Sequence, residues 1–173
     1  MHPALAFSSK ENSYKDLDGA FFTIEGDKEA LDILTKNLDR LKNPYKILKT
    51  KDKSGYHLST VCVSNLVIGL GYMATELLKI YDFSEREALD ALKVLGEKNL
   101  ENFFDKGAIN SLTGPVDRGD YNTINSHFDF LDKHDLKIEK EVYSKISTLL
   151  LEISKKKNPN RDYNILEEEL KKN

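Results

Sequence analysis

The sequence predicts a mostly α-helical protein that begins with a small βαβ unit. Clusters of aromatic and β-branched residues, which favour strands, occur only before residue 51. From residue 53 onward, apolar residues recur with helical spacing and no alternating run follows. A chain of 173 residues can bury one good core. We therefore expect residues 1–52 to form a βαβ extension of a larger sheet and residues 53–173 to form a helical bundle.

Three consecutive segments predict the βαβ unit. The segment AFFTIEG, residues 20–26, is aromatic and β-branched and is bounded by glycines, as is typical of a strand. Helical spacing follows in four leucines, namely Leu31, Leu34, Leu38 and Leu41. Pro44 then ends the helix, and residues 45–50 form a second candidate strand. A strand, a helix and a second strand in this order are typical of a βαβ unit.

One long apolar segment opens the helical part, from residue 56 to residue 81. It contains no proline and is apolar around nearly its whole circumference. A single helix of that length spans about 39 Å, and we expect other helices to wrap and bury it. Further helices are predicted at 84–107, 121–134 and 139–156, with a loop of turn-forming residues at 109–120. Ser84 and Glu87 have the spacing of a capping box.

A glycine motif inside the long apolar segment raises the question of nucleotide binding. Residues 67–75 read VIGLGYMAT, in which Gly69, Gly71 and Ala74 have the spacing of a dinucleotide-binding turn. Such a turn needs a strand before it and a second strand that ends in an acidic residue about 20 residues later. The sequence after Gly71 contains no strand signal. We therefore expect both glycines to lie inside a helix, where they would let another helix pack closely.

Charge and composition argue against several classes of partner. The net charge is −3 and is spread along the chain, which disfavours nucleic acid and anionic membranes. We see no export signal, and no uninterrupted apolar run approaches the roughly 20 residues that span a bilayer. The single cysteine, Cys62, fits a reducing compartment. We expect a soluble, cytoplasmic protein.

Lys53, His57 and Asn65, at the start of the long apolar segment, form the first candidate site. A cationic or imidazole donor beside a side-chain amide could protonate a carbonyl or an imine as it is reduced. The alternative is a histidine that caps the helix entry and has its hydrogen bonds satisfied. The residues alone leave this choice open.

The loop LTGPVDRGD, residues 112–120, is the second candidate. Thr113, Arg118 and backbone amides freed by Gly114 and Gly119 could bind a carboxylate or a phosphate, with arginine making a bidentate contact. Alternatively, the loop is a rigid connection in which Asp120 caps the next helix. The two interpretations are compatible.

The helix after this loop carries a third group of polar residues. Asp120, Thr123 and His127 lie on one helix face, and His134 and several aspartates are near in sequence. A metal site is imaginable there, but nothing shows the three or four converging ligands that zinc requires. A surface helix explains the acidic residues better, and we expect no metal.

Four motifs in a fixed order resemble one known family. They are HPALAFSS, GAFFTIEGD, KSGYHLSTVCVSN and LTGPVDRGDYNTINSH, and they extend over most of the chain. The sequence resembles the uncharacterised helical domain that follows a Rossmann domain in predicted NAD(P)-dependent oxidoreductases. That family is similar to the 6-phosphogluconate dehydrogenase superfamily, near pyrroline-carboxylate reductase and ketopantoate reductase in architecture.

The resemblance implies a set of partners. In the family a nucleotide-binding domain precedes the His-Pro motif, so residues 1–52 would extend a Rossmann sheet that this chain lacks. NAD or NADP would be bound through that domain and not by this chain alone. Residues 53–173 would shape the pocket for a small-molecule substrate and form a homodimer through the long helix. We therefore expect the isolated chain to be inactive; the alternative is a non-catalytic helical interaction or scaffold module.

The candidates together predict a single groove. Unpaired buried polar groups cost about 1–3 kcal/mol each, so we expect four side chains to converge: His57, Asn65, Thr113 and Arg118. Asp120 and His127 would brace the groove, within one chain or across a dimer. In a full enzyme Arg118 would anchor an acidic substrate, and Lys53 or His57 would donate the proton.

Overall fold

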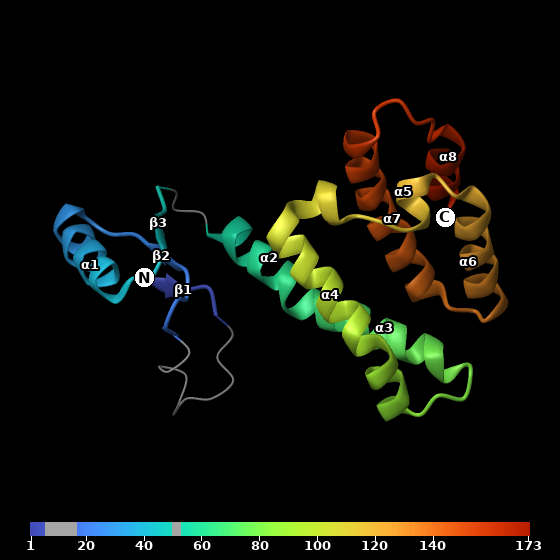
Figure 1. Ribbon diagram of the computed structural model, residues 1–173, viewed down its shortest axis with the longest axis horizontal. Helices are drawn as coiled ribbons and strands as arrows, with labels where there is room; N and C mark the ends of the chain where they lie inside the picture. Colours follow the sequence, from blue (N-terminus) through green and yellow to red (C-terminus); the bar gives the residue numbers. More distant parts are fainter. Residues whose placement is uncertain (6–16, 50–52) are drawn as a thin grey trace. The chain divides into compact units, whose positions relative to one another are not determined.

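The computed structural model describes residues 1–5, 17–49 and 53–173, and its contacts divide the chain into two compact units. The first unit comprises residues 1–72 and the second comprises residues 73–173. Among the described residues, strands occur only before residue 48, and every regular element from Ser54 onward is a helix (Figure 1). The predicted fold class, mostly α-helical with a short strand-containing lead-in, is confirmed.

The sheet of the first unit contains the predicted βαβ unit. Strand β2 (Phe22–Ile24) runs parallel to β3 (Tyr45–Ile47), and helix α1 (Lys28–Leu41) connects them. A third strand, β1 (His2–Pro3), pairs antiparallel with the other edge of β2 and was not predicted. The order is therefore β1-β2-β3, with β2 in the centre.

The core of the first unit lies between the central strand and α1. Phe22 and Ile24 pack with Leu38, and Leu31 and Leu34 contact them from the same helix face. These are three of the four leucines of the predicted stripe; the fourth, at the end of α1, is 59% exposed. Burial of one helix face against the sheet explains why α1 needs little internal stability of its own.

The long apolar segment forms two helices, α2 (Ser54–Val63) and α3 (Asn65–Lys79). They are separated at Ser64, whose φ of −116° and ψ of −81° are not helical. The expectation of one buried helix was wrong, because Thr75 is the only fully buried residue of the two helices. Gly69 and Gly71 lie inside α3 as predicted, but no atom approaches the position of an added Cβ within 4 Å at either. The close helix packing expected at these glycines is therefore absent from the described chain.

Helices α2 and α3 are also relevant to whether the chain contains a segment that could span a membrane. Together they cover 26 residues, with a mean hydropathy of 1.5 in their most apolar window and 6% of that window buried. By length and composition this stretch could cross a bilayer, which differs from the prediction that no such run exists. A single stretch of this kind is weak evidence for a span, because helices that pack against other protein surfaces have the same composition.

The second unit is helical throughout. Its helices are α4 (Glu85–Ser111), α5 (Pro115–Arg118), α6 (Tyr121–Lys133), α7 (Lys137–Lys157) and α8 (Asn164–Lys172). The predicted capping box starts α4: Ser84 Oγ accepts from the Glu87 amide, and the Ser84 amide donates to the Glu87 carboxylate at 2.9 Å. Gly107, with a φ of 73°, interrupts α4 one turn before its end.

Helices α5 to α8 enclose the main core of the second unit (Figure 1). The buried residues of this core are Val116, Ile124, Phe128, Leu151, Tyr163, Leu166 and Leu170. Two of them come from α8, a helix that was not predicted as a separate element. On the face of α7 toward α8, Ser144 is fully buried and donates from Oγ to the Leu170 carbonyl at 3.1 Å.

Candidate functional site

A cavity of about 280 Å³ opens in the first unit where the two parallel strands end. Glu25 follows β2 directly, Leu48 follows β3, and both line the cavity. Lys53, Tyr56 and His57 line it from the start of α2. In open α/β sheets ligands bind outside the carboxyl ends of parallel strands, so the topology itself favours a binding site here.

Lys53 brings a charge to this cavity and is held by Glu25. The ammonium group of Lys53 forms an ion pair with the Glu25 carboxylate, and their side chains are 56% and 39% exposed. The carbonyl oxygen of Lys53 accepts from the His57 amide at 2.8 Å, which starts α2. Lys53 and His57, two of the three predicted catalytic residues, therefore lie one helical turn apart and line the same cavity.

The hydroxyl group of Tyr56 is the unusual polar group of this site. Among the described residues it is the one buried side-chain polar atom without a hydrogen-bond partner. The Tyr56 ring meets His2 edge-on, with centroids 5.7 Å apart and planes at 89°. A buried hydroxyl without a partner costs about 1–3 kcal/mol, and a ligand that accepts its hydrogen bond would recover that cost.

Asn65, the third predicted catalytic residue, lies elsewhere. It begins α3 after the break at Ser64, and its side-chain oxygen accepts from Ser64 Oγ at 3.0 Å. Ser64 Oγ also lies 2.7 Å from the Thr60 carbonyl. Asn65 does not line the cavity of Lys53 and His57, and its contacts are those of a helix junction.

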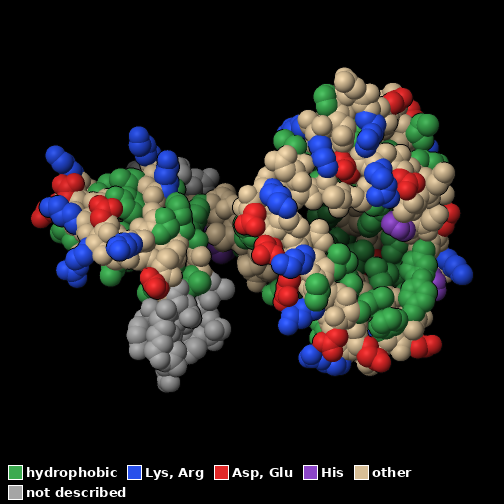
Figure 2. All heavy atoms as spheres, in the orientation of Figure 1, with side chains coloured by type: hydrophobic (Ala, Val, Ile, Leu, Met, Phe, Trp, Pro, Cys, Tyr) green, Lys and Arg blue, Asp and Glu red, His purple; other side chains and the backbone are tan. Residues whose placement is uncertain are grey.

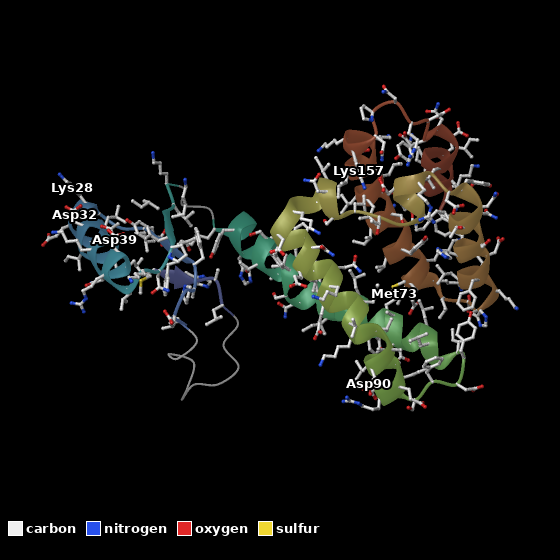
Figure 3. The ribbon with its side chains drawn as sticks, viewed as in Figure 1. Lys28, Asp32, Asp39, Met73, Asp90 and Lys157 are labelled. Carbon is white, nitrogen blue, oxygen red and sulfur yellow. The ribbon has the colours of Figure 1, made fainter. Side chains whose placement is uncertain are left out.

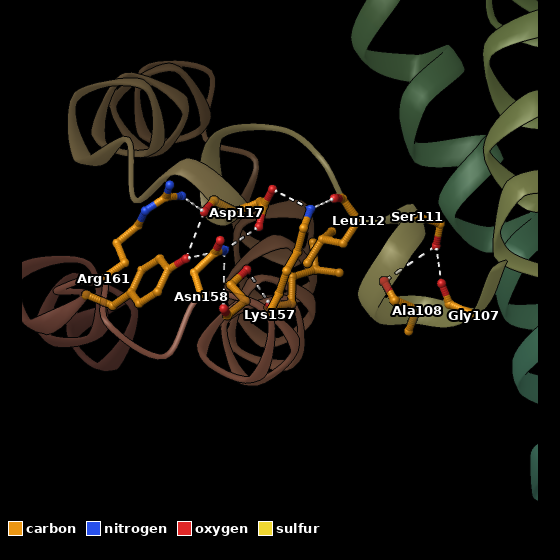
Figure 4. A network of polar contacts seen from close by, with 11 residues as sticks. Gly107, Ala108, Ser111, Leu112, Asp117, Lys157, Asn158 and Arg161 are labelled. Atoms are coloured by element: carbon orange, nitrogen blue, oxygen red, sulfur yellow. Dashed lines mark hydrogen bonds and ion pairs between the residues drawn. The ribbon is translucent and has the colours of Figure 1, made fainter.

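Asp117, within the loop of the second candidate site, connects this loop to the end of α7 (Figure 4). The Asp117 carboxylate accepts from Lys157 Nζ and from Asn158 Nδ2, each at 2.9 Å. The Asp117 carbonyl accepts from the Tyr163 hydroxyl at 2.8 Å and from Arg161 at 2.5 Å. Burial raises the pKa of Asp117, but the bonds from Lys157 and Asn158 and the nearby positive charges outweigh it, so that the pKa is lowered. The carboxylate is thus a structural anchor between α5 and the end of α7.

The predicted anion-binding groups of this loop are mostly used internally. The amides of Arg118, Gly119 and Asp120 donate to carbonyls of the same turn, at Gly114, Val116 and Pro115. Gly114 and Gly119 have φ angles of 98° and 68°, which only glycine adopts without strain. Thr113 and the Arg118 side chain remain exposed, and Arg118 lies 3.5 Å from the Asp120 carboxylate.

Asp120 is the helix cap that the alternative interpretation predicted. Its carboxylate accepts from the Thr123 amide at 3.2 Å and from the Thr123 hydroxyl at 2.8 Å. Hydrogen bonds from Thr123, and then the Arg118 guanidinium, lower the pKa of Asp120. The carboxylate therefore remains ionised and stabilises the N-terminus of α6.

His127 lies two turns into α6 at a second cavity. This cavity has a volume of about 530 Å³ and is formed by α3, α4, α6 and α7 within the second unit. His127 Nδ1 is 2.7 Å from the Tyr143 hydroxyl. Arg118 and Thr113 do not line it, so the loop and His127 belong to different sites within this unit.

The structure thus brings together some predicted residues and not others. Lys53 and His57 share a cavity in the first unit, where Glu25 and Tyr56 are additional lining residues. Thr113, Gly114, Arg118, Asp120 and His127 all lie in the second unit. A groove that joins both groups remains a prediction. Within the described ranges no cluster of three or more potential metal ligands occurs.

The fold defines the class to which the protein belongs: a helical domain preceded by a short βαβ unit. The chain belongs to the family described as "Domain of unknown function (DUF2520)", which matches residues 20–149. No curated protein matches the chain.

The solved structures that resemble the chain include two bacterial proteins. Protein TM1727 from Thermotoga maritima matches with a TM-score of 0.76 and 26% identity, over 91% of this chain and 61% of that one. A protein described as "putative NADP oxidoreductase BF3122" from Bacteroides fragilis matches with a TM-score of 0.62 and 24% identity, over 79% of this chain and 51% of that one. This chain therefore spans little more than half the length of either protein.

Proposed function

We propose that this chain is the substrate-binding and dimerising part of an NAD(P)-dependent oxidoreductase whose nucleotide-binding domain lies outside it. The match to only 61% and 51% of two solved chains, one described as an NADP oxidoreductase, supports a partner domain. The sequence motifs described above support the same arrangement. We further infer a soluble, cytoplasmic protein that does not bind nucleic acid.

The cavity at the carboxyl ends of β2 and β3 is the observation that carries this proposal. Tyr56, Lys53 and His57 line one small volume, and the buried Tyr56 hydroxyl has no hydrogen-bond partner among the described residues. Hydroxyl and ammonium donors would hold a carbonyl oxygen or an imine nitrogen, and Lys53 or His57 would supply a proton to it. A nicotinamide held by the other domain would supply the hydride.

We expect the described part of this chain to offer no dinucleotide site of its own. Gly69 and Gly71 lie in the interior of α3, where backbone amides are already bonded along the helix. A phosphate-binding turn needs free amides at a helix N-terminus. The described strands also lack the parallel pair that would flank such a turn, since both parallel strands precede it in sequence.

The dimer follows from the apolar surface of α2 and α3. Leu58, Ile68 and Tyr72 are 59%, 72% and 65% exposed, although they belong to an apolar stretch. Large exposed apolar patches mark interfaces, and homodimers with two-fold symmetry are the commonest soluble assembly. A second copy of the chain would cover this surface.

The test compares the chain alone with the chain joined to a nucleotide domain. Calorimetry with NADPH should show no binding to the isolated chain. A chimera that adds the part of the Bacteroides fragilis protein outside the match should bind NADPH at micromolar concentration. A chimera that folds and does not bind NADPH would contradict the proposal, and so would binding to the isolated chain that Gly71→Val abolishes.

A non-catalytic helical interaction or scaffold module is the alternative. One observation distinguishes this alternative from the oxidoreductase proposal. The proposal expects the reading frame or the gene next to this sequence to encode a βαβ domain with a G-x-G-x-x-G turn, and the scaffold alternative does not. The paired substitutions Lys53→Met and His57→Leu separate the two functions in the chimera. They should lower turnover without loss of NADPH affinity if the cavity is catalytic, and should change neither if the chain is a scaffold.

A further inference from the structure

The larger cavity, in the second unit, has no part in the proposed reaction site. Its wall is apolar and includes Met73 and Leu77 from α3, Leu92 from α4, and Phe130 and Leu131 from α6. Figure 2 shows hydrophobic side chains gathered around a hollow in the right-hand part of the view, and Figure 3 labels Met73 in this unit. The volume of about 530 Å³ is within the range of pockets that bind small molecules, about 300–1,000 Å³.

Few polar residues line this cavity, and apart from one histidine they are uncharged. Ser126, His127 and the tyrosines Tyr81 and Tyr143 are its polar residues, and no Lys, Arg, Asp or Glu lines it. A charged ligand would meet an apolar lining without a lysine, arginine or carboxylate partner, which disfavours it relative to a neutral one. The lining therefore selects for neutral molecules.

His127 and Tyr143 are hydrogen-bonded to each other and carry one further hydrogen atom outside that bond. His127 Nδ1 and the Tyr143 hydroxyl oxygen are 2.7 Å apart, so one hydrogen atom lies between them. When the Tyr143 hydroxyl donates to Nδ1, the Nε2–H of the exposed His127 is the donor that a ligand can use. In the other tautomer the Tyr143 hydroxyl is the remaining donor, and it also interacts with Ser147. Burial raises the pKa of Tyr143, which keeps the phenol protonated at neutral pH.

The wall around this donor is fixed by aromatic contacts. The Tyr143 ring meets the buried Phe128 edge-on, with centroids 5.4 Å apart, and meets the His127 ring in the same way at 5.5 Å. Tyr81 and Phe130 stack at 6.1 Å with planes 10° apart. A wall that is already packed loses little further freedom when a ligand binds.

We infer that this cavity binds a neutral, mostly apolar small molecule that carries one hydrogen-bond-accepting oxygen, of the class of medium-chain or aromatic ketones. The alkyl or aromatic part would contact the leucine and phenylalanine side chains of α3, α4 and α6. The oxygen would accept the hydrogen bond from the His127–Tyr143 pair. This inference concerns a separate cavity and does not depend on the proposed oxidoreductase function.

Calorimetry with 2-octanone as the probe tests the inference, with octanoate as the charged analogue of equal chain length. We expect 2-octanone to bind at least tenfold more tightly than octanoate. The double variant Tyr143→Phe/His127→Leu removes both donors and should weaken 2-octanone by about fivefold to tenfold, as one lost hydrogen bond predicts. Equal affinity for octanoate, or no effect of the double variant, would overturn the assignment of the ligand class.

Substitutions that fill the cavity provide a second test of the inference. Ala74→Trp, from α3, should abolish 2-octanone binding, whereas Ala91→Trp, at an exposed alanine of α4 outside the lining, should not. Leu92→Trp fills the same space from α4 if the first variant does not fold, as judged by circular dichroism. The alternative occupant is a second copy of the chain: if 2-octanone does not bind and Ala74→Trp converts a dimer to a monomer in light scattering, the inference is wrong.

Discussion

The Tyr56 hydroxyl is buried and has no hydrogen-bond partner among the described residues, which indicates a functional role for Tyr56. Natural proteins pair almost all their buried polar atoms, and this hydroxyl is the exception among the side chains that the structure describes. Tyr56 lines the same cavity as Lys53 and Glu25, at the ends of two parallel strands. The simplest physical explanation is that its partner is a ligand.

We predict that Tyr56→Phe leaves the free energy of unfolding unchanged or raises it by about 1 kcal/mol. The ring and its edge contact with His2 remain, and only an unpaired hydroxyl is lost. Urea unfolding followed by circular dichroism measures the effect. A loss above 1 kcal/mol would show that the hydroxyl has a structural partner in the folded chain.

Asp117 is the opposite case, a polar residue whose partners are all within the chain. We expect Asp117→Asn to destabilise the protein by about 1–3 kcal/mol, because Lys157 loses its anionic partner in a largely buried place. Asp90→Asn is the matched control (Figure 3), since Asp90 pairs with Arg86 on an exposed helix face. Such exposed pairs contribute about 0–1 kcal/mol, so similar losses in both variants would contradict the anchoring role.

At the scale of single elements, the stability of α4 depends more on the capping box at its N-terminus than on burial of its side chains. Ala88 is its only fully buried residue, and most of its other side chains are exposed. We predict that Ser84→Ala lowers stability by about 1 kcal/mol, because the bonds of the Ser84 hydroxyl to the Glu87 amide and carboxylate are lost, whereas the backbone amide of residue 84 keeps its bond to the Glu87 carboxylate. Thermal unfolding measures this, and Ser84→Asp, which restores a cap, should recover most of the loss.

The joint between α7 and α8 should make stability depend on pH. Glu167 accepts from Lys155 at 2.6 Å and from Lys171 at 2.9 Å, and these bonds lower the pKa of Glu167 to about 2. Because this value lies below the usual 4.5, the stabilisation is complete above about pH 4.5 and is lost as pH falls toward 2.

Urea unfolding of the wild type and Glu167→Gln at pH 7, 4.5 and 3 tests this expectation. The difference in stability between the two proteins should shrink as the pH falls below about 4.5, because the unfolded wild type then binds a proton at Glu167 while the folded state, with a pKa of about 2, still excludes it. A difference that is constant from pH 7 to pH 3 would show that the ion pairs do not contribute.

At the scale of the whole molecule, the exposed apolar surface of α2 and α3 is the main unexplained feature. We predict that the protein is a homodimer at micromolar concentration and that Ile68→Glu makes it monomeric. Ile68 is 72% exposed on α3, whereas Ile33, at 56%, lies on α1 and provides the matched control Ile33→Glu. Light scattering distinguishes dimer from monomer. A monomeric wild type, or an equal effect of Ile68→Glu and Ile33→Glu, would contradict the prediction.

The sequence predicted most elements of this fold but only part of the candidate site. Periodicity located α1, α6 and α7, and the capping rule located the start of α4, because these features depend on residues close in sequence. The pairing of β1 with β2 was not predicted, since it joins residues about twenty positions apart through a ladder of only two residues. Helix α8 was missed because its apolar residues are too few to distinguish it from a solvated helix end.

By itself, the sequence determined the fold class, the helical place of Gly69 and Gly71, and the cap at Asp120. Each of these follows from local backbone chemistry that needs no distant partner. Only the tertiary structure decided that Lys53 and His57 share a cavity with Glu25 and Tyr56, and that His127 faces Tyr143 instead of Arg118. It also showed that the apolar helix predicted to be buried is exposed in the single chain. The physical reason is that helical periodicity specifies which face is apolar, whereas burial depends on the other surfaces that cover that face.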